Sequence, residues 1–218
     1  MKLRAIDFYE FVGIVVPGSV LLVSVGYLLS AAKLAALLAP EAFGSFGVHV
    51  ILAYVVGHLL QGLGNVIESL YWRAWKGMPT DWPVTSPANP QFIGAKSAVL
   101  TLCGYTGPSN ATLGLAEWRV LVARVRSTIY VSGRASRLQF FNGNYAMFRG
   151  LLAAEAVISL TAWWSTAGRT VLYPAIGLAI LLTAYRMHRF GVHYAQELFA
   201  NAAELAEASK DRRPREIS

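Results

Sequence analysis

Five polar or aromatic side chains recur at helical spacing within a long apolar stretch in the first third of the chain. Their separations are three, four, three and four residues, which places them on one face of a helix. They are His58, Gln61, Asn65, Glu68 and Trp72. Imidazole, amide and carboxylate groups in such a position bond to a neighbouring helix, line a wet path or hold a polar substrate. The sequence therefore predicts an intramembrane polar stripe.

The polar stripe has three interpretations, which the sequence leaves open. The first is an interhelical hydrogen-bond seam, and Gly57 and Gly64 on a neighbouring strip favour the close helix approach that a seam needs. The second is the lining of a pore. The pore remains an alternative because an interhelical hydrogen bond in a membrane contributes on average only about 0.6 kcal/mol. Bonds of that strength compensate poorly for the cost of burying several polar groups, so a seam alone does not explain the stripe. The third is a substrate site.

Glu68 needs a cationic partner or water, because it lies at the end of an apolar run. Arg149 is placed at the matching end of a later apolar run, so we expect a Glu68–Arg149 contact. Arg73 and Arg137 are the rival partners. The alternative is a carboxylate at headgroup level with no specific partner.

Signals of enzymatic chemistry are poor. His188 and His193 are five residues apart and do not share a helical face, and no cysteine or acidic residue completes a metal site with them. No nucleophile elbow, zinc-protease motif or phosphate loop is present. Cys103 is the lone cysteine and is expected to be a small buried residue. We expect a protein that is not an enzyme, with no metal, no cofactor and no catalytic residue.

The composition indicates the elements that must position these side chains. The chain has 218 residues, of which 55% are hydrophobic and only 14% charged, against about 25% charged in soluble domains. Apolar runs of about 20 residues can cross a bilayer, and only helices satisfy the backbone there. Four such spans are expected, at about 11–34, 44–70, 148–167 and 170–190. Pro17 and Gly18 predict a kink in the first.

Lysine and arginine residues near the span ends predict the orientation. They cluster before the first and third spans and after the second and fourth: Lys2, Arg4, Arg73, Lys76, Arg137, Arg149, Arg186 and Arg189. Only Lys33 and Arg169 lie in the short connections. Both termini and the middle segment are therefore expected to be cytoplasmic, and the net charge of +7 is explained by topology rather than nucleic-acid binding.

The expected fold is an all-α membrane protein with four transmembrane helices. Residues 1–72 and 146–190 form two transmembrane hairpins. A helical cytoplasmic insertion at 73–145 separates them, and a cytoplasmic helix with a disordered tail follows at 191–218. Within the insertion, a short helix capped by Asn89 should run from Pro90 to about Leu102, and an amphipathic helix from Leu115 to Val131. Helix should resume at Arg137, and the last helix should end near Ser209.

Three segments resemble motifs of small bacterial membrane proteins: Asp7-Phe8-Tyr9-Glu10-Phe11 with Pro17-Gly18, Gly57 to Asn65, and Arg189 to Ala195. The plan of a few spans and a modest cytoplasmic part is similar to membrane effectors of anti-phage defence systems. The resemblance implies an inner-membrane protein that forms homo-oligomers and disrupts or permeabilises the lipid bilayer. The alternative is a scaffolding membrane subunit that recruits a cytoplasmic protein, and a membrane-embedded enzyme is the third hypothesis.

Overall fold

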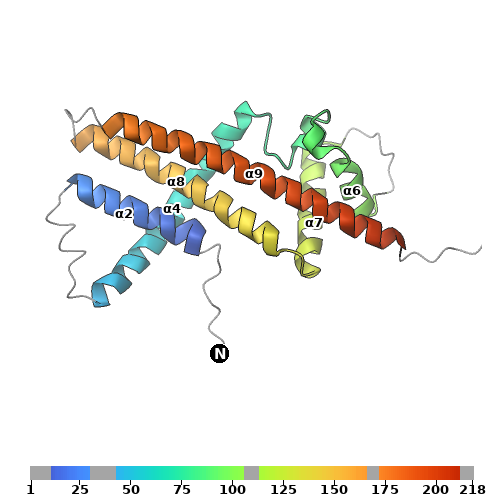
Figure 1. The fold of residues 1–218 in the computed structure, drawn as a ribbon, viewed down its shortest axis with the longest axis horizontal. Helices are drawn as coiled ribbons and strands as arrows, with labels where there is room; N and C mark the ends of the chain where they lie inside the picture. Colours follow the sequence, from blue (N-terminus) through green and yellow to red (C-terminus); the bar gives the residue numbers. More distant parts are fainter. Residues whose placement is uncertain (1–10, 30–42, 106–112, 166–171, 212–218) are drawn as a thin grey trace, which may run out of the picture. The chain divides into compact units, whose positions relative to one another are not determined.

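The computed structural model describes residues 11–29, 43–105, 113–165 and 172–211, and within these ranges the chain forms helices and turns but no strand (Figure 1). The elements are η1 (Phe11–Val15), α2 (Val16–Leu29), α4 (Phe43–Ala74), α5 (Trp82–Thr85), η2 (Pro90–Phe92), α6 (Ala95–Leu102), α7 (Leu115–Val131), α8 (Ser136–Ser165) and α9 (Leu172–Asp211). The all-helical fold predicted from the composition is confirmed for this part of the chain.

The chain packs as two compact units. Unit 1 comprises residues 1–71 and 142–190, and unit 2 comprises residues 72–141 and 191–218. Helices α4, α8 and α9 are each continuous across a boundary and contribute residues to both units.

In unit 1, helix α9 runs antiparallel to α8. Contacts near both ends establish this direction: the rings of Phe148 and Phe190 are stacked with centroids 5.5 Å apart, and those of Trp163 and Tyr173 are 6.4 Å apart. Helix α4 crosses α2 and α8 at a steep angle (Figure 1). Small residues dominate where these helices meet, and the core between α4 and α8 is formed by Leu60, Ala153 and Ala154.

Two glycines allow α2 and α4 to touch through their backbones. A Cβ atom built on Gly18 would collide with the Ala53 carbonyl oxygen, and one on Gly57 would collide with the Ile14 carbonyl oxygen. The pairs 14–57 and 18–53 also show that the two helices are antiparallel. Such small-residue contacts are the usual means of close packing between membrane helices.

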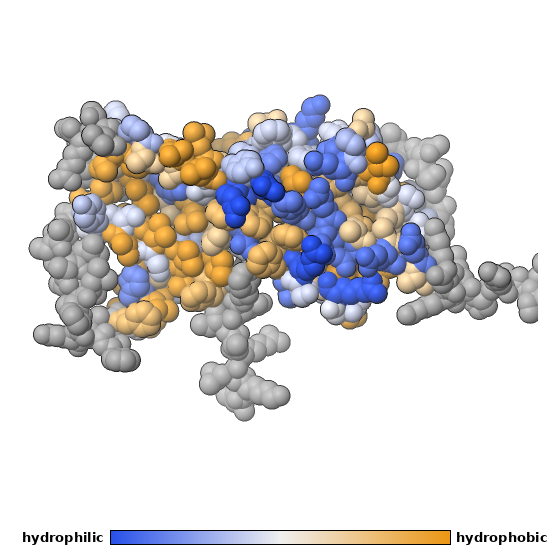
Figure 2. Space-filling view, viewed as in Figure 1, coloured by the Kyte–Doolittle hydropathy of each residue, from blue (hydrophilic) through white to orange (hydrophobic). Residues whose placement is uncertain are grey.

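Three described helical stretches are long and apolar enough to cross a membrane: Phe11–Leu28, Phe46–Ala74 and Ser136–Trp164. Many of their exposed side chains are apolar, including Leu59, Leu160 and Trp163, each at least 70% exposed. Figure 2 shows hydrophobic side chains gathered over the visible surface of α2 and α8 in unit 1.

The predicted fourth span and several other predictions fall partly on residues outside the described ranges. The predicted fourth span starts at residue 170, and residues 166–171 lie outside the described ranges. The part of this span that lies in α9 is not among the three candidate stretches, since Arg186 and Arg189 lower its hydropathy. The end of the first span at 30–34, the flanking Lys2, Arg4, Lys33 and Arg169, the segment Asp7–Glu10 and the tail after Asp211 also lie outside. The four-span layout therefore stays a prediction.

Unit 2 is built around a row of aromatic rings. Trp72, Trp82, Phe92, Phe199 and Trp118 follow one another with centroids 5.7–6.1 Å apart. This row joins the end of α4, the short elements α5 and η2, helix α7 and the last part of α9 into one core. Burial of such large rings is the main stabilising term for a unit of this size.

The helix predictions for unit 2 are confirmed at several boundaries and wrong at two. Helix α7 has the predicted bounds, Leu115–Val131, and helix α8 starts at Ser136, one residue before the expected Arg137. The predicted helix after Asn89 is interrupted. Asn89 does cap Gln91, but only the 3-10 turn Pro90–Phe92 follows, because Gly94 adopts a left-handed φ of 82° before α6 begins.

The second error concerns residues 78–90, whose Pro-rich composition predicts a loop. Residues Trp82–Thr85 form the short helix α5 there, with Pro83 in its first turn. Proline is tolerated at that position because the first helical N–H groups have no acceptor.

Candidate functional site

The residues predicted to do chemistry meet in unit 1 as a polar network between α4 and α8. The Arg149 guanidinium donates from Nη1 to the Glu68 carboxylate at 2.5 Å and from Nη2 to the Gln61 carbonyl oxygen at 2.6 Å. Tyr145 donates its hydroxyl proton to the other Glu68 oxygen at 2.8 Å. The expected Glu68–Arg149 contact is therefore present, and both side chains are largely buried, at 13% and 15% exposure.

The rival partners of Glu68 lie elsewhere. Arg137 pairs with Glu197 at 3.6 Å, and Arg73 is exposed.

Gln61 extends the network to the start of α2. Its side-chain nitrogen donates to the Gly13 and Ala146 carbonyl oxygens. Pro17 has no N–H, so it cannot supply the helical hydrogen bond that the carbonyl four residues earlier, at Gly13, would accept. The turn Phe11–Val15 is correspondingly wound as a π-helix. A π-helical turn thus lies on the N-terminal side of Pro17, and α2 continues through Pro17 and Gly18, so the kink itself stays a prediction.

The other predicted members of the stripe are not in this network. His58 and Asn65 are exposed, and the described contact of His58 is an edge-on ring contact with Tyr54 at 4.6 Å. The prediction of one shared face is geometrically right, but the stripe lies at the border of the buried face of α4. Gln61 and Glu68 are on the inner edge, and His58 and Asn65 are on the outer edge.

The outer edge contains two further residues that the sequence analysis did not single out. Gly62 and Ser69 are also exposed, and a Cβ atom built on Gly62 meets nothing within 4 Å. His58, Gly62, Asn65 and Ser69 are spaced by four, three and four residues. We call these four residues the outer polar edge of α4. Their helical periodicity was the signal that could have identified them.

The predicted packing glycines are in contact with neighbouring helices. Gly57 faces Ile14 of η1, and a Cβ atom on Gly64 would lie 3.1 Å from the Arg149 side chain. Gly64 thus leaves room for the arginine that pairs with Glu68. These contacts give Gly57 and Gly64 a role in assembling the network.

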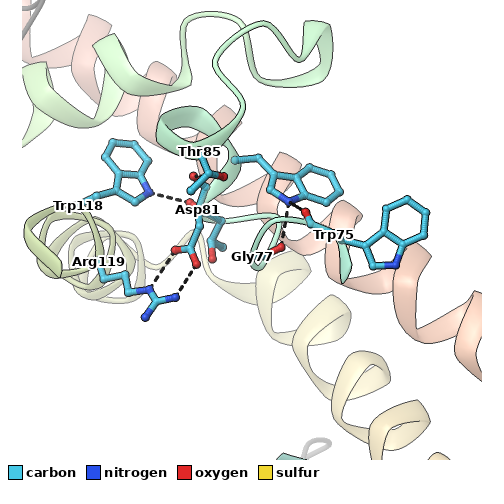
Figure 3. A network of polar contacts seen from close by, with 8 residues as sticks. Trp75, Gly77, Asp81, Thr85, Trp118 and Arg119 are labelled. Carbon is cyan, nitrogen blue, oxygen red and sulfur yellow. Dashed lines mark hydrogen bonds and ion pairs between the residues drawn. The ribbon is translucent and has the colours of Figure 1, made fainter. Parts of the chain in front are cut away.

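A second polar network stabilises unit 2 and is shown in Figure 3. The Asp81 carboxylate, only 3% exposed, accepts two hydrogen bonds from Arg119, of 3.2 and 2.7 Å. The adjacent Trp118 donates its indole N–H to the Thr80 carbonyl oxygen at 2.7 Å. The carboxylate raises the pKa of Arg119, chiefly by hydrogen bonding. These bonds fasten α7 to the loop before α5, which indicates a structural role.

The described residues lack a cluster of side chains suited to binding a metal ion. They contain no group of three or more His, Cys, Asp or Glu side chains close enough to hold a metal ion. Cys103 is half-buried rather than fully buried, with its Sγ 3.7 Å from the Leu121 carbonyl oxygen, and burial raises the pKa of its thiol. An open groove of about 290 Å³ lies beside α6 in unit 2, and its lining includes the rings of Phe92 and Phe199, the side chains of Gln91 and Gln196, and several alanines.

No family model matches the chain, and comparisons with curated proteins and with solved structures give no significant match. The resemblance to defence effectors therefore rests on the sequence motifs alone.

Proposed function

We propose that the protein is an oligomeric membrane protein in which copies meet along the outer polar edge of α4 and enclose a conducting path. The observation that carries the proposal is the exposure of His58, Gly62, Asn65 and Ser69 on one face of an apolar helix. Gln61 and Glu68, two polar residues that border this edge, already have partners within the chain.

The physical argument rests on what lipid cannot do. Imidazole and amide groups facing acyl chains have no hydrogen-bond partner, so polar residues in spans face protein or water. The neighbouring exposed residues, Val55, Leu59 and Val66, are apolar and suit lipid. A helix surface with a polar edge between apolar flanks favours a ring of several copies of the chain. In such a ring the polar edge faces inward, and the apolar flanks face lipid or the next copy.

Gly62 and Ser69 support close approach of the copies, because small residues let membrane helices pack through their backbones. His58 and Asn65 supply groups that hydrogen-bond to another copy or to water. Glu68 is neutralised by Arg149, so the charge of the path does not come from this carboxylate.

Cysteine cross-linking in the native membrane tests the interface. Asn65→Cys and Ser69→Cys, each in a Cys103→Ala background, should form disulfide-linked dimers on mild oxidation. Leu70→Cys is the matched control, since Leu70 is 60% exposed at the same depth but lies on another face of α4. Cross-linking of the control alone, or of none of the three, would contradict the proposed interface.

Ion flux from liposomes tests the path. The wild-type protein should release trapped ions, and the double variant His58→Leu/Asn65→Leu should not. If this variant stays oligomeric but loses flux, the outer polar edge lines the path; if it no longer assembles, the edge is a packing seam. Absence of flux from the wild type in every state would leave the scaffolding subunit as the better hypothesis.

The proposal includes a bacterial inner membrane with both termini in the cytoplasm, and a role in defence or stress. The distribution of Lys and Arg and the motif resemblance support these two points. Induced expression in bacteria should depolarise the membrane and arrest growth, and the His58→Leu/Asn65→Leu variant should do neither. Growth unaffected by wild-type protein that reaches the membrane would count against the effector role.

A further inference from the structure

A second carboxylate of unit 1, that of the half-buried Glu155, has a different environment from Glu68. Glu155 is in α8, six residues beyond Arg149 and within the apolar stretch Ser136–Trp164. Its Oε1 accepts a hydrogen bond of 2.7 Å from the hydroxyl of Thr183 in α9. Thr183 itself is only 8% exposed. Its Oε2 is buried and has no hydrogen-bond partner among the residues that the structure describes.

The cationic groups in the unit 1 parts of α8 and α9 contact other residues, and Arg189 of α9 lies over the Tyr185 ring, 5.9 Å from its centroid. Arg149 of α8 is bonded to Gln61 and Glu68. Arg186 of α9 lies over the rings of Phe148 and Phe190, at 5.6 and 5.1 Å.

The ring of His188, also on α9, bonds to the Tyr71 hydroxyl at 3.1 Å. Within the described ranges, no Lys, Arg or His forms an ion pair with Glu155.

An ionised carboxylate without a cation is costly in such surroundings, whereas the neutral acid is far less so. The hydrogen bond from Thr183 remains possible in the neutral form, because a carboxylic acid keeps a carbonyl oxygen that accepts. We infer that Glu155 is a proton-binding site inside the membrane bundle, with the proton on Oε2. The site joins α8 to α9, so gain or loss of the proton acts on the contact between these helices.

An apolar carbodiimide tests the inference on the unmodified protein. Dicyclohexylcarbodiimide reacts with a protonated carboxyl: the acid proton moves to one carbodiimide nitrogen while the carboxyl oxygen bonds to the central carbon. Rearrangement then gives a stable N-acylurea, with no leaving group. Mass spectrometry of the protein from native membranes should find one carbodiimide on Glu155, and labelling should fall as the pH of the reaction is raised.

Glu68 is the internal control: its two oxygens accept hydrogen bonds from Tyr145 and Arg149, so it should not take the label. A Glu155→Gln variant should lose the label entirely, and Thr183→Val should retain it. A water-soluble carbodiimide with a free amine should modify Glu155 much less than the apolar reagent. Failure of the apolar reagent to label Glu155, labelling independent of pH, or equal modification by the water-soluble reagent would each overturn the inference. The test does not require oligomerisation or conductance, so it is independent of the proposed function.

Discussion

Gln61 donates its side-chain amide to the Gly13 carbonyl oxygen, the group that Pro17 leaves without its helical donor. The same side chain accepts from Arg149, which in turn pairs with Glu68. The π-helical turn η1 and an ion pair between α4 and α8 are thus coupled through one glutamine. In lipid, where a free carbonyl cannot bond to water, such a donor is needed for a proline-containing helix.

Replacing Gln61 by Leu should destabilise unit 1. The substitution leaves the Gly13 and Ala146 carbonyl oxygens and the Arg149 guanidinium without this partner, and an unsatisfied buried group costs about 1–3 kcal/mol. Denaturant unfolding in detergent micelles measures the change. Asn65→Leu is the control and should leave the stability of the monomer unchanged, since Asn65 is exposed. Equal stability of Gln61→Leu and wild type would exclude this role for Gln61.

The Glu68–Arg149 pair should show strong coupling in a double-mutant cycle. Removing one partner of a largely buried ion pair costs about 3–5 kcal/mol, whereas removing both costs less than the sum. We expect Glu68→Gln and Arg149→Gln each to lower the unfolding free energy, and the double variant to recover part of the loss. A Glu68→Gln protein that assembles and unfolds like the wild type would show that the pair has no energetic role.

Gly57→Ala should weaken the packing of α2 on α4. The new Cβ atom would meet the Ile14 carbonyl oxygen, a backbone atom that cannot turn aside, and overpacking of this kind costs about 1–3 kcal/mol. Gly47→Ala, which meets nothing within 4 Å on the same helix, is the matched control and should be neutral or slightly stabilising. Thermal unfolding in one detergent compares the two, and equal midpoints would contradict the close contact.

Asp81→Asn should loosen unit 2 without affecting the spans. The variant loses the charge that Arg119 binds at 2.7 Å, at a cost of about 1–2 kcal/mol, because the arginine itself is mostly exposed. Glu204→Gln breaks the exposed Arg134–Glu204 pair and should cost under about 1 kcal/mol. Limited proteolysis around Asp81 should therefore accelerate in the first variant and stay unchanged in the second.

Alkylation of Cys103 should be slow at neutral pH. Burial raises the pKa of its thiol, while Arg124 lowers it in part, and only the thiolate attacks iodoacetamide. The folded protein should react more slowly than the same protein in denaturant, and the rate should rise as the pH increases toward the raised pKa. Arg124→Gln removes the opposing effect and should slow the reaction further; a faster reaction would contradict this electrostatic account.

The sequence alone determined the helical character of the chain, its apolar stretches and the bounds of one helix. Its apolar runs established the all-helical, membrane-like character, and the periodicity from Leu115 to Val131 established the bounds of α7. The expectation that Glu68 meets Arg149 also came from the sequence, because a carboxylate in an apolar run needs a cation and few are placed at a matching depth.

The tertiary structure decided which edge of the polar stripe faces inward. Residue spacing determines how side chains are placed relative to one another around a helix, but not how the helix is rotated against its neighbours. For that reason Gln61 and Glu68 could not be distinguished from His58 and Asn65 beforehand. The partnership of Gln61 with Gly13 needed the crossing of α4 over α2, which depends on contacts between residues 48 positions apart.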